Sequence, residues 1–63
     1  MQVFNVSGMT CSHCERAVTR AIQALDPQAQ VRVDLAAGTV QVQSSVSEQA
    51  IRQAISEEGY QVS

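Results

Sequence analysis

The segment "GMTCSHC", residues 8–14, places two cysteines, a methionine and a histidine within seven positions. Cys11 and Cys14 have the C-x-x-C spacing of metal-binding and thiol redox sites. Thiolates are soft ligands, so a pair of them selects Cu(I), Zn(II), Hg(II) or an iron–sulfur centre over hard cations. The spacing therefore indicates a metal or redox function for this segment.

The number of available ligands narrows the choice of metal. A closed structural zinc site uses about four ligands, and iron–sulfur clusters also need more cysteines than this chain has. The chain has two cysteines in total, and His13 lies between them as a candidate third ligand. Two thiolates can hold Cu(I) alone in a near-linear arrangement, which leaves the ion accessible. An open site of this kind suits metal transfer better than storage or support of the fold.

Composition and charge are typical of a small globular domain. The chain has 63 residues, of which 44% are hydrophobic and 16% are charged, so we expect a single domain with one thin core. The formal net charge is −2, and the cations are four arginines. A general attraction to nucleic acid or to an anionic membrane surface is therefore not expected.

The N-terminal residues lack the pattern of a signal peptide, and no apolar run approaches the ~20 residues that a membrane-spanning helix needs. The expected location is therefore cytoplasmic. Structural disulfides are rare in that compartment, so a C-x-x-C pair is expected to bind metal or to be redox-active.

Changes in hydrophobic period predict the elements that position the cysteines. Alternating apolar and polar residues predict strands, and apolar residues spaced by three and four predict helices. Asp26-Pro27 is expected to end the first helix, because the residue before a proline is disfavoured in the α conformation. Gly38 is expected to form a short hairpin turn, and Gly59 to end the second helix. The expected elements are a strand at 4–6, a helix at 14–25, strands at 31–35 and 39–43, a helix at 46–58 and a strand at 60–62.

Each helix is expected to be buried along one apolar stripe. Either Ser47, or Ser45 together with Glu48, is expected to cap the second helix. The expected stripes consist of Ala17, Val18, Ala21, Ile22 and Leu25 in the first helix, and of Val46, Ala50, Ile51, Ala54 and Ile55 in the second.

The order strand, helix, strand, strand, helix, strand predicts an α+β domain. In the split βαβ arrangement, both helices cover one face of a four-stranded antiparallel sheet, while the other face stays in water. This order places Cys11 in the loop after the first strand and Cys14 in the first helical turn. Free N–H groups and the positive dipole end of the helix favour a thiolate there. These patterns are complete without a metal, so the fold is not expected to require one.

Essentially the whole chain resembles the heavy-metal-associated domain. The likeness rests on "GMTCSHC" before an amphipathic helix, on the V-x-V-x-L-x-x-G-x-V-x-V pattern of residues 31–42, and on the later "AISEEGY". As a single domain of residues 1–63, the chain is similar to small bacterial copper chaperones. The resemblance implies a ferredoxin-like fold and binding of Cu(I) by Cys11 and Cys14. It also implies delivery of the ion to a copper-transporting P-type ATPase or to a copper-responsive regulator.

The resemblance further implies roles for residues around the cysteines. Met9 is expected to point into the core and support the loop, with metal ligation as the alternative. A neutral Thr10 favours Cu(I), because relatives that handle zinc or cadmium often carry an acidic residue at this place. His13 is either a third ligand or a solvent-facing residue. Tyr60 is expected to shield or tune the thiolates, or to close the end of the sheet.

Arg16 and Arg20 lie about one turn apart on the expected exposed side of the first helix, beside the metal loop. Complementary charge near the face that carries the metal would speed and orient docking. The two arginines are therefore candidates for contact with a partner, with simple solvation as the alternative.

No general acid–base pair or substrate pocket is recognisable in the sequence, so the protein is not expected to be an enzyme. Three other functions stay open: a metal-binding module of a copper ATPase, a mercury- or zinc-binding relative, and a small thiol–disulfide redox protein. The metal-free protein is expected to be a monomer, and because exposed two-thiolate sites can share copper between two molecules, a copper-bridged dimer is an alternative form at high copper loading.

Overall fold

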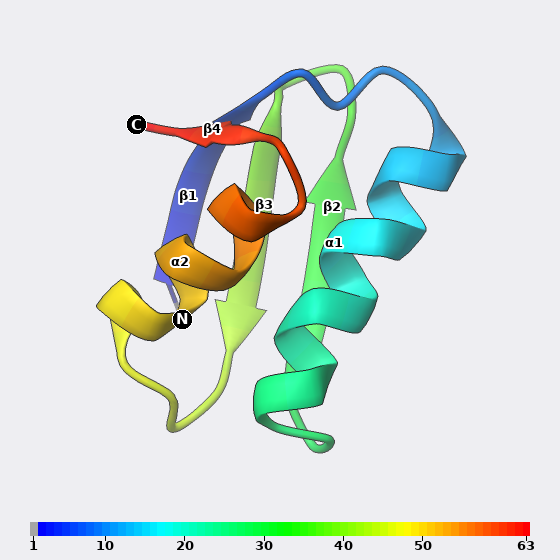
Figure 1. Cartoon of the computed structure of the whole chain (residues 1–63). Coiled ribbons are helices and arrows are strands. Elements are labelled where there is room, and N and C mark those ends of the chain that lie inside the picture. Colours follow the sequence, from blue (N-terminus) through cyan, green and yellow to red (C-terminus); the bar gives the residue numbers. More distant parts are fainter. Residues whose placement is uncertain (1) are drawn as a thin grey trace.

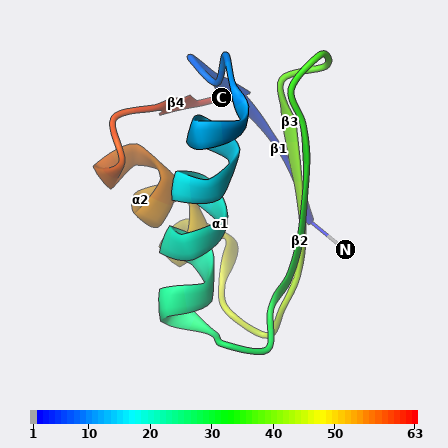
Figure 2. The ribbon, with the colours of Figure 1, turned by 90° about the vertical axis from the view of Figure 1, so that its right-hand side faces the viewer.

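A computed structural model describes residues 2–63 as a sheet that two helices cover on one face. The strands lie in the order β2-β3-β1-β4, and each neighbouring pair is antiparallel. Figures 1 and 2 show both helices on the same side of this sheet. The predicted α+β split βαβ arrangement, which is the ferredoxin-like topology, is confirmed. The elements are β1 (Gln2–Ser7), α1 (Ser12–Leu25), β2 (Gln30–Asp34), β3 (Thr39–Gln43), α2 (Glu48–Glu57) and β4 (Gln61–Val62).

The core lies between the sheet and the helices. In the sheet register, Val40 of β3 lies opposite Phe4 of β1 and Val33 of β2. Because directly paired residues point to the same face, these side chains form one apolar surface beneath the helices. The large side chains that are fully buried are Phe4, Val18, Ile22, Val40, Val42, Ile51 and Ile55.

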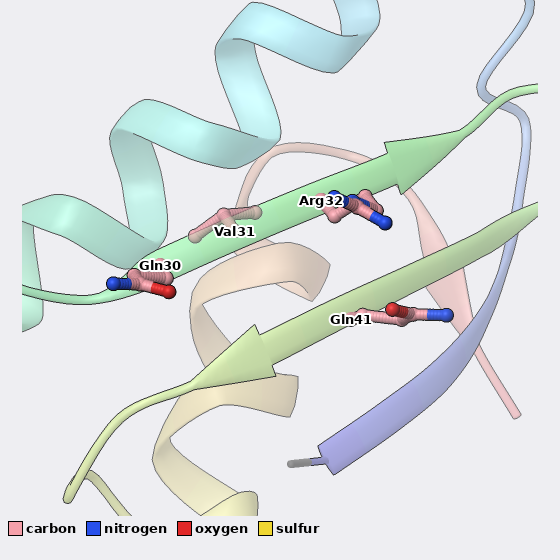
Figure 3. Close-up of a pocket in the computed structure, with 4 residues that line it drawn as sticks. All are labelled: Gln30, Val31, Arg32 and Gln41. Carbon is pink, nitrogen blue, oxygen red and sulfur yellow. The ribbon is translucent and has the colours of Figure 1, made fainter.

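The other face of the sheet is polar. Arg32 of β2 lies opposite Gln41 of β3, and Figure 3 shows their side chains on the face turned away from the helices. With Gln30 and Val31 they line a shallow hollow. Val3, which is 59% exposed, is the apolar exception on this side. The predicted wet sheet face is confirmed.

The ends of α1 determine where the cysteines lie. The helix begins at Ser12, two residues before the predicted start, and Cys14 is in its first turn as expected. Asp26 ends the helix and donates its backbone N–H to the carbonyl oxygen of Ile22 at 3.1 Å. The neighbouring Pro27 explains this end, because proline disfavours the α conformation of the residue before it.

The buried stripe of α1 is shorter than predicted. Val18 and Ile22 are fully buried, whereas Leu25 is 46% exposed. Leu25 instead lines an open groove beside α2 with Ala50 and Gln53. The expectation that Leu25 belongs to the core is wrong, because the last turn of α1 reaches this groove and not the closed space above the sheet.

The remaining boundaries differ from prediction by a few residues at most. Ser47 caps α2 by accepting the Ala50 backbone N–H at 3.3 Å, which decides between the two caps that the sequence allowed. Gly38 and Gly59 have φ angles of 69° and 95°, as their turns require. Leu35 lies in the turn and not in β2.

Within residues 2–63, no helix is long and apolar enough to cross a membrane.

Candidate metal centre

The segment between β1 and α1 crosses one end of the sheet (Figure 1). Gly8 has a φ of 96°, a left-handed conformation that other residues rarely adopt. A Cβ atom at Gly8 would lie 3.4 Å from Cδ1 of Tyr60, so the glycine also leaves room for this ring. Met9 is 6% exposed and belongs to the core. The loop is therefore anchored in two ways: the Met9 side chain packs in the core, and Gly8 packs against the ring of Tyr60.

Cys11 and Cys14 lie together where the loop enters α1. The carbonyl oxygen of Cys11 accepts the backbone N–H groups of Cys14 and Glu15 at 3.1 and 3.3 Å. Cys11 is the N-cap residue, yet its side chain makes no capping hydrogen bond. The two Sγ atoms are 3.7 Å apart, and both thiols are free. Cys11 is exposed and Cys14 is half-buried, so the pair is open to solvent on one side.

The distance between the sulfurs fits chelation of one soft metal ion. With metal–sulfur bonds of about 2.3 Å, two sulfurs are about 3.7 Å apart in a bent, near-tetrahedral chelate and about 4.6 Å apart in a linear one. The observed 3.7 Å matches the bent case. A near-linear Cu(I) site needs the sulfurs to separate by about 1 Å. A small rotation of the exposed Cys11 side chain would give this larger distance between the sulfurs.

The surroundings of Cys14 favour its thiolate. Hydrogen bonding with the Tyr60 side chain is the largest cause that lowers the pKa of Cys14 from 9.0 to about 6. The backbone at Thr10 and the thiol of Cys11 lower this pKa further, whereas burial opposes them. The same hydrogen bond raises the pKa of Tyr60 to about 12, because a phenol that donates to a thiolate holds its proton more tightly. One sulfur is therefore largely ionised at neutral pH.

The other predicted site residues are on the surface. His13, Thr10, Arg16 and Arg20 are exposed. In the part of the chain that the structure describes, no group of three or more His, Cys, Asp or Glu side chains is arranged to hold a metal. His13 instead lines a shallow hollow with Ala17 and the two arginines. The structure thus brings together Cys11 and Cys14 but does not add His13 to them.

The contact between Gly8 and Tyr60 was not predicted from the sequence. The two residues lie near opposite ends of the chain, and β4 brings them together by pairing with the end of β1. In the sequence, a glycine directly after a strand indicates a positive φ angle at Gly8, but it does not indicate which residue packs against it. The packing partner of this glycine depends on the sheet order, which local patterns do not reveal.

A titration of Cys14 tests the role of the tyrosine hydroxyl. In a Cys11→Ser background, we expect the thiolate absorbance of Cys14 to titrate well below the ordinary thiol range. Adding Tyr60→Phe removes the largest cause of the lowered pKa, so the titration should move back toward 9.0 and alkylation at pH 7 should slow. Identical titration curves for the two proteins would contradict this assignment.

Comparison with known proteins agrees with this geometry. Residues 3–61 match the model of the heavy-metal-associated domain. The chain belongs to this family. This heavy-metal-associated domain is 39% identical over 64 residues to the copper chaperone CopZ of Staphylococcus aureus (strain bovine RF122 / ET3-1), an alignment that covers 97% of this chain and 94% of that protein.

Solved structures show the same fold over the whole chain. The copper chaperone Atx1 from Synechocystis PCC6803, in its Cu2 form, superposes with a TM-score of 0.97 at 36% identity and covers 100% of both chains. A CopZ metallochaperone has a TM-score of 0.92 at 35% identity and covers 98% of this chain and 97% of its own. The ferredoxin-like fold that the resemblance implied is therefore confirmed for this heavy-metal-associated domain.

Proposed function

We propose that this protein is a cytoplasmic copper chaperone and not an enzyme. It binds one Cu(I) ion through Cys11 and Cys14 and passes the ion on by thiolate exchange. The receiving site is a metal-binding domain of a copper-transporting P-type ATPase, or a copper-responsive regulator. Without copper the protein is a monomer.

One observation carries this proposal: two free thiols lie 3.7 Å apart at an exposed helix N-terminus. Two soft ligands without a third protein ligand favour Cu(I) over metals that need a closed site. Relatives over nearly the full chain are named copper chaperones. The neutral, exposed Thr10 adds no oxygen ligand that would favour a harder metal.

Ligand exchange explains how an ion that is held tightly can still leave quickly. A thiolate of the partner bonds to Cu(I) from the open side before a protein sulfur is released, so the free ion never forms. Cys11 is the more exposed sulfur and is the first to be released. Cys14, which is half-buried and readily ionised, keeps the ion in place until the second partner thiolate has bonded.

The test is an anaerobic competition with a Cu(I)-selective chelator, followed by transfer to a second C-x-x-C domain. Wild type should retain one Cu(I) per chain, while the Cys11→Ser/Cys14→Ser double variant should retain none. Loaded wild type should transfer copper to the second domain faster than the chelator can capture any released ion. Failure to retain Cu(I), or retention by the double variant, would contradict the proposal.

The same preparation separates two of the other functions that the sequence leaves open, a thiol–disulfide redox protein and a mercury- or zinc-binding relative. A lowered thiol pKa is also a property of C-x-x-C redox enzymes. A redox protein would reduce insulin disulfides and would not hold Cu(I) against the chelator. A relative that handles Hg(II) or Zn(II) would retain those ions in parallel titrations in preference to Cu(I).

A further inference from the structure

Strand β2 forms one edge of the sheet. It pairs with β3 on one side, and within residues 2–63 no strand pairs with its other side. Edge strands attract further strands, and proteins usually protect them with proline, bulges or lysine. β2 contains no proline, its register with β3 runs without interruption, and the chain has no lysine. The outer edge of β2 is therefore open to pairing with another strand.

The hydrogen bonds of β1 show which way the backbone groups of the sheet point. The carbonyl oxygen of Asn5 accepts the backbone N–H of Ser63 at 2.9 Å, on the β4 side. Because the direction alternates along a strand, the N–H and C=O groups of Phe4 point the other way, toward β3. Phe4 lies opposite Val40, so the backbone groups of Val40 bond with β1 and not with β2.

The backbone groups of Val33 and Val31 therefore point to the free edge. Val33 of β2 lies opposite Val40, whose N–H and C=O face β1, so Val33 directs its own groups away from β3. Val31 lies two residues earlier in the strand and points the same way. In an added antiparallel strand, the residues that bond with these two valines place their side chains on the helix side of the sheet.

Helix α1 forms a groove with this edge. Figure 1 shows the N-terminal half of α1 projecting past β2, on the side away from β3. The groove has a volume of about 400 Å³, and its lining residues are Glu15, Arg16, Thr19, Arg20, Gln23 and Val31. Both arginines are exposed, and the ion pair that forms within residues 2–63, Arg52 with Glu48, does not include them.

Positive charge is concentrated along this edge although the domain is acidic overall. The formal net charge is −2 and the chain has four arginines. Two of them line the groove, and a third, Arg32, lies on the other face of β2. Of the nearby acids, Glu15 lies in the groove, and Asp34 accepts the backbone N–H of Ala37 at 3.1 Å. A segment that carries carboxylates would therefore complement this edge.

We propose that an extended acidic segment of a partner protein adds to the sheet as a fifth strand, antiparallel to β2 and in the groove beside α1. Its carboxylates lie opposite Val31 and Val33, on the side of Arg16 and Arg20. In this mode of recognition, backbone hydrogen bonds provide affinity and alternate side chains provide specificity. The two cysteines are not part of the groove, so this inference goes beyond the proposed function and does not depend on metal binding.

The position of α1 disfavours a second copy of the domain as the occupant. If two β2 strands paired, each α1 would project toward the other copy, on the same face of the joined sheet (Figure 1). The groove arginines of the two copies would then meet, and like charges repel. A segment without a helix of its own avoids this contact.

The first experiment titrates a peptide into the isotope-labelled, metal-free full chain and follows the amide signals by NMR at low salt. The probe is a capped peptide in which threonine and glutamate alternate, so that its glutamates share one face. We expect saturable shifts at Val31, at Val33 and along the groove side of α1. A peptide with lysine in place of glutamate should cause none. Equal binding of the two peptides, or shifts confined to residues away from β2, would overturn the proposal.

N-methylated peptides separate strand addition from attraction of charge alone. In the antiparallel arrangement, the N–H groups of the glutamates point to β2 and those of the threonines point to solvent. Methyl groups on the glutamate nitrogens should therefore abolish binding, whereas methyl groups on the threonine nitrogens should preserve it. Equal binding of both methylated peptides would refute strand addition, and loss with methylated threonine alone would refute the antiparallel direction.

Charge variants test the groove arginines. Arg16→Gln/Arg20→Gln should weaken binding of the unmodified peptide by roughly 2- to 30-fold at low salt, and high salt should remove most of this difference. The matched control, Gln49→Glu/Gln53→Glu, lowers the net charge by the same amount at exposed positions of α2 and should have a much smaller effect. A control that binds as weakly as the arginine variant would show that net charge, and not the groove, attracts the peptide.

A backbone variant tests β2 itself. Val33→Pro removes one N–H that points to the free edge, where proline is tolerated, and Val33→Ala is the control that keeps it. We expect loss of peptide binding in Val33→Pro only. If Val33→Pro does not fold, the methylated peptides decide the question on wild type. Wild-type affinity in a folded Val33→Pro would overturn the proposal, and Cu(I) retention by all variants would leave the proposed function standing.

Discussion

Cys11→Ser and Cys14→Ser are each expected to weaken Cu(I) binding by more than about a hundredfold, because loss of even a supporting partner outside the ligand set costs about 10- to 100-fold. Each variant leaves a single thiolate, and no other His, Cys, Asp or Glu in the described residues completes a set of three with the pair. His13→Ala should change the affinity much less, because His13 is exposed and lies in the hollow beside Arg16 and Arg20.

The measurement is competition with a Cu(I)-selective chelator at several pH values, under anaerobic conditions. His13→Ala serves as the matched control, since it alters the same short segment without removing a sulfur. A serine variant with wild-type affinity would show that its cysteine is not a ligand. An equal loss in His13→Ala would show that the histidine does bind the metal.

Ile22→Ala is expected to lower the free energy of unfolding of the metal-free protein by about 3 kcal/mol, because it leaves a cavity at a fully buried site. Leu25→Ala, in the same helix, should lower it by less than about 1 kcal/mol, because that side chain is 46% exposed. The sequence pattern treats the two residues alike, so the comparison isolates the effect of burial.

Urea denaturation followed by circular dichroism measures both free energies. A domain of this size has a free energy of unfolding of roughly 3–9 kcal/mol, so Ile22→Ala could be largely unfolded before urea is added. Ile22→Val, with an expected loss of about 1 kcal/mol, keeps the site measurable. Equal losses in Ile22→Ala and Leu25→Ala would mean that Leu25 is as well packed as Ile22.

Local patterns predicted the elements of this fold because each element carries its own signal. Alternation around Val40 and Val42 marks a strand whatever the rest of the chain does, and Asp26-Pro27 stops a helix by local sterics. The same local reasoning placed Cys14 in the first turn of α1. It was wrong about Leu25, because periodicity shows which side of a helix is apolar but not how much of that side packs against other elements.

The amino-acid sequence by itself determined the order of the elements, the two soft ligands and their place before a helix. These features follow from side-chain period, turn chemistry and C-x-x-C spacing, all of which act over a few residues. The resemblance implied that Tyr60 acts near the thiolates, but the tertiary structure alone decided that its ring packs on Gly8 and that Leu25 lies outside the closed core. Those relations depend on β4 pairing with β1 and on α1 lying beside α2, which join residues far apart in the chain.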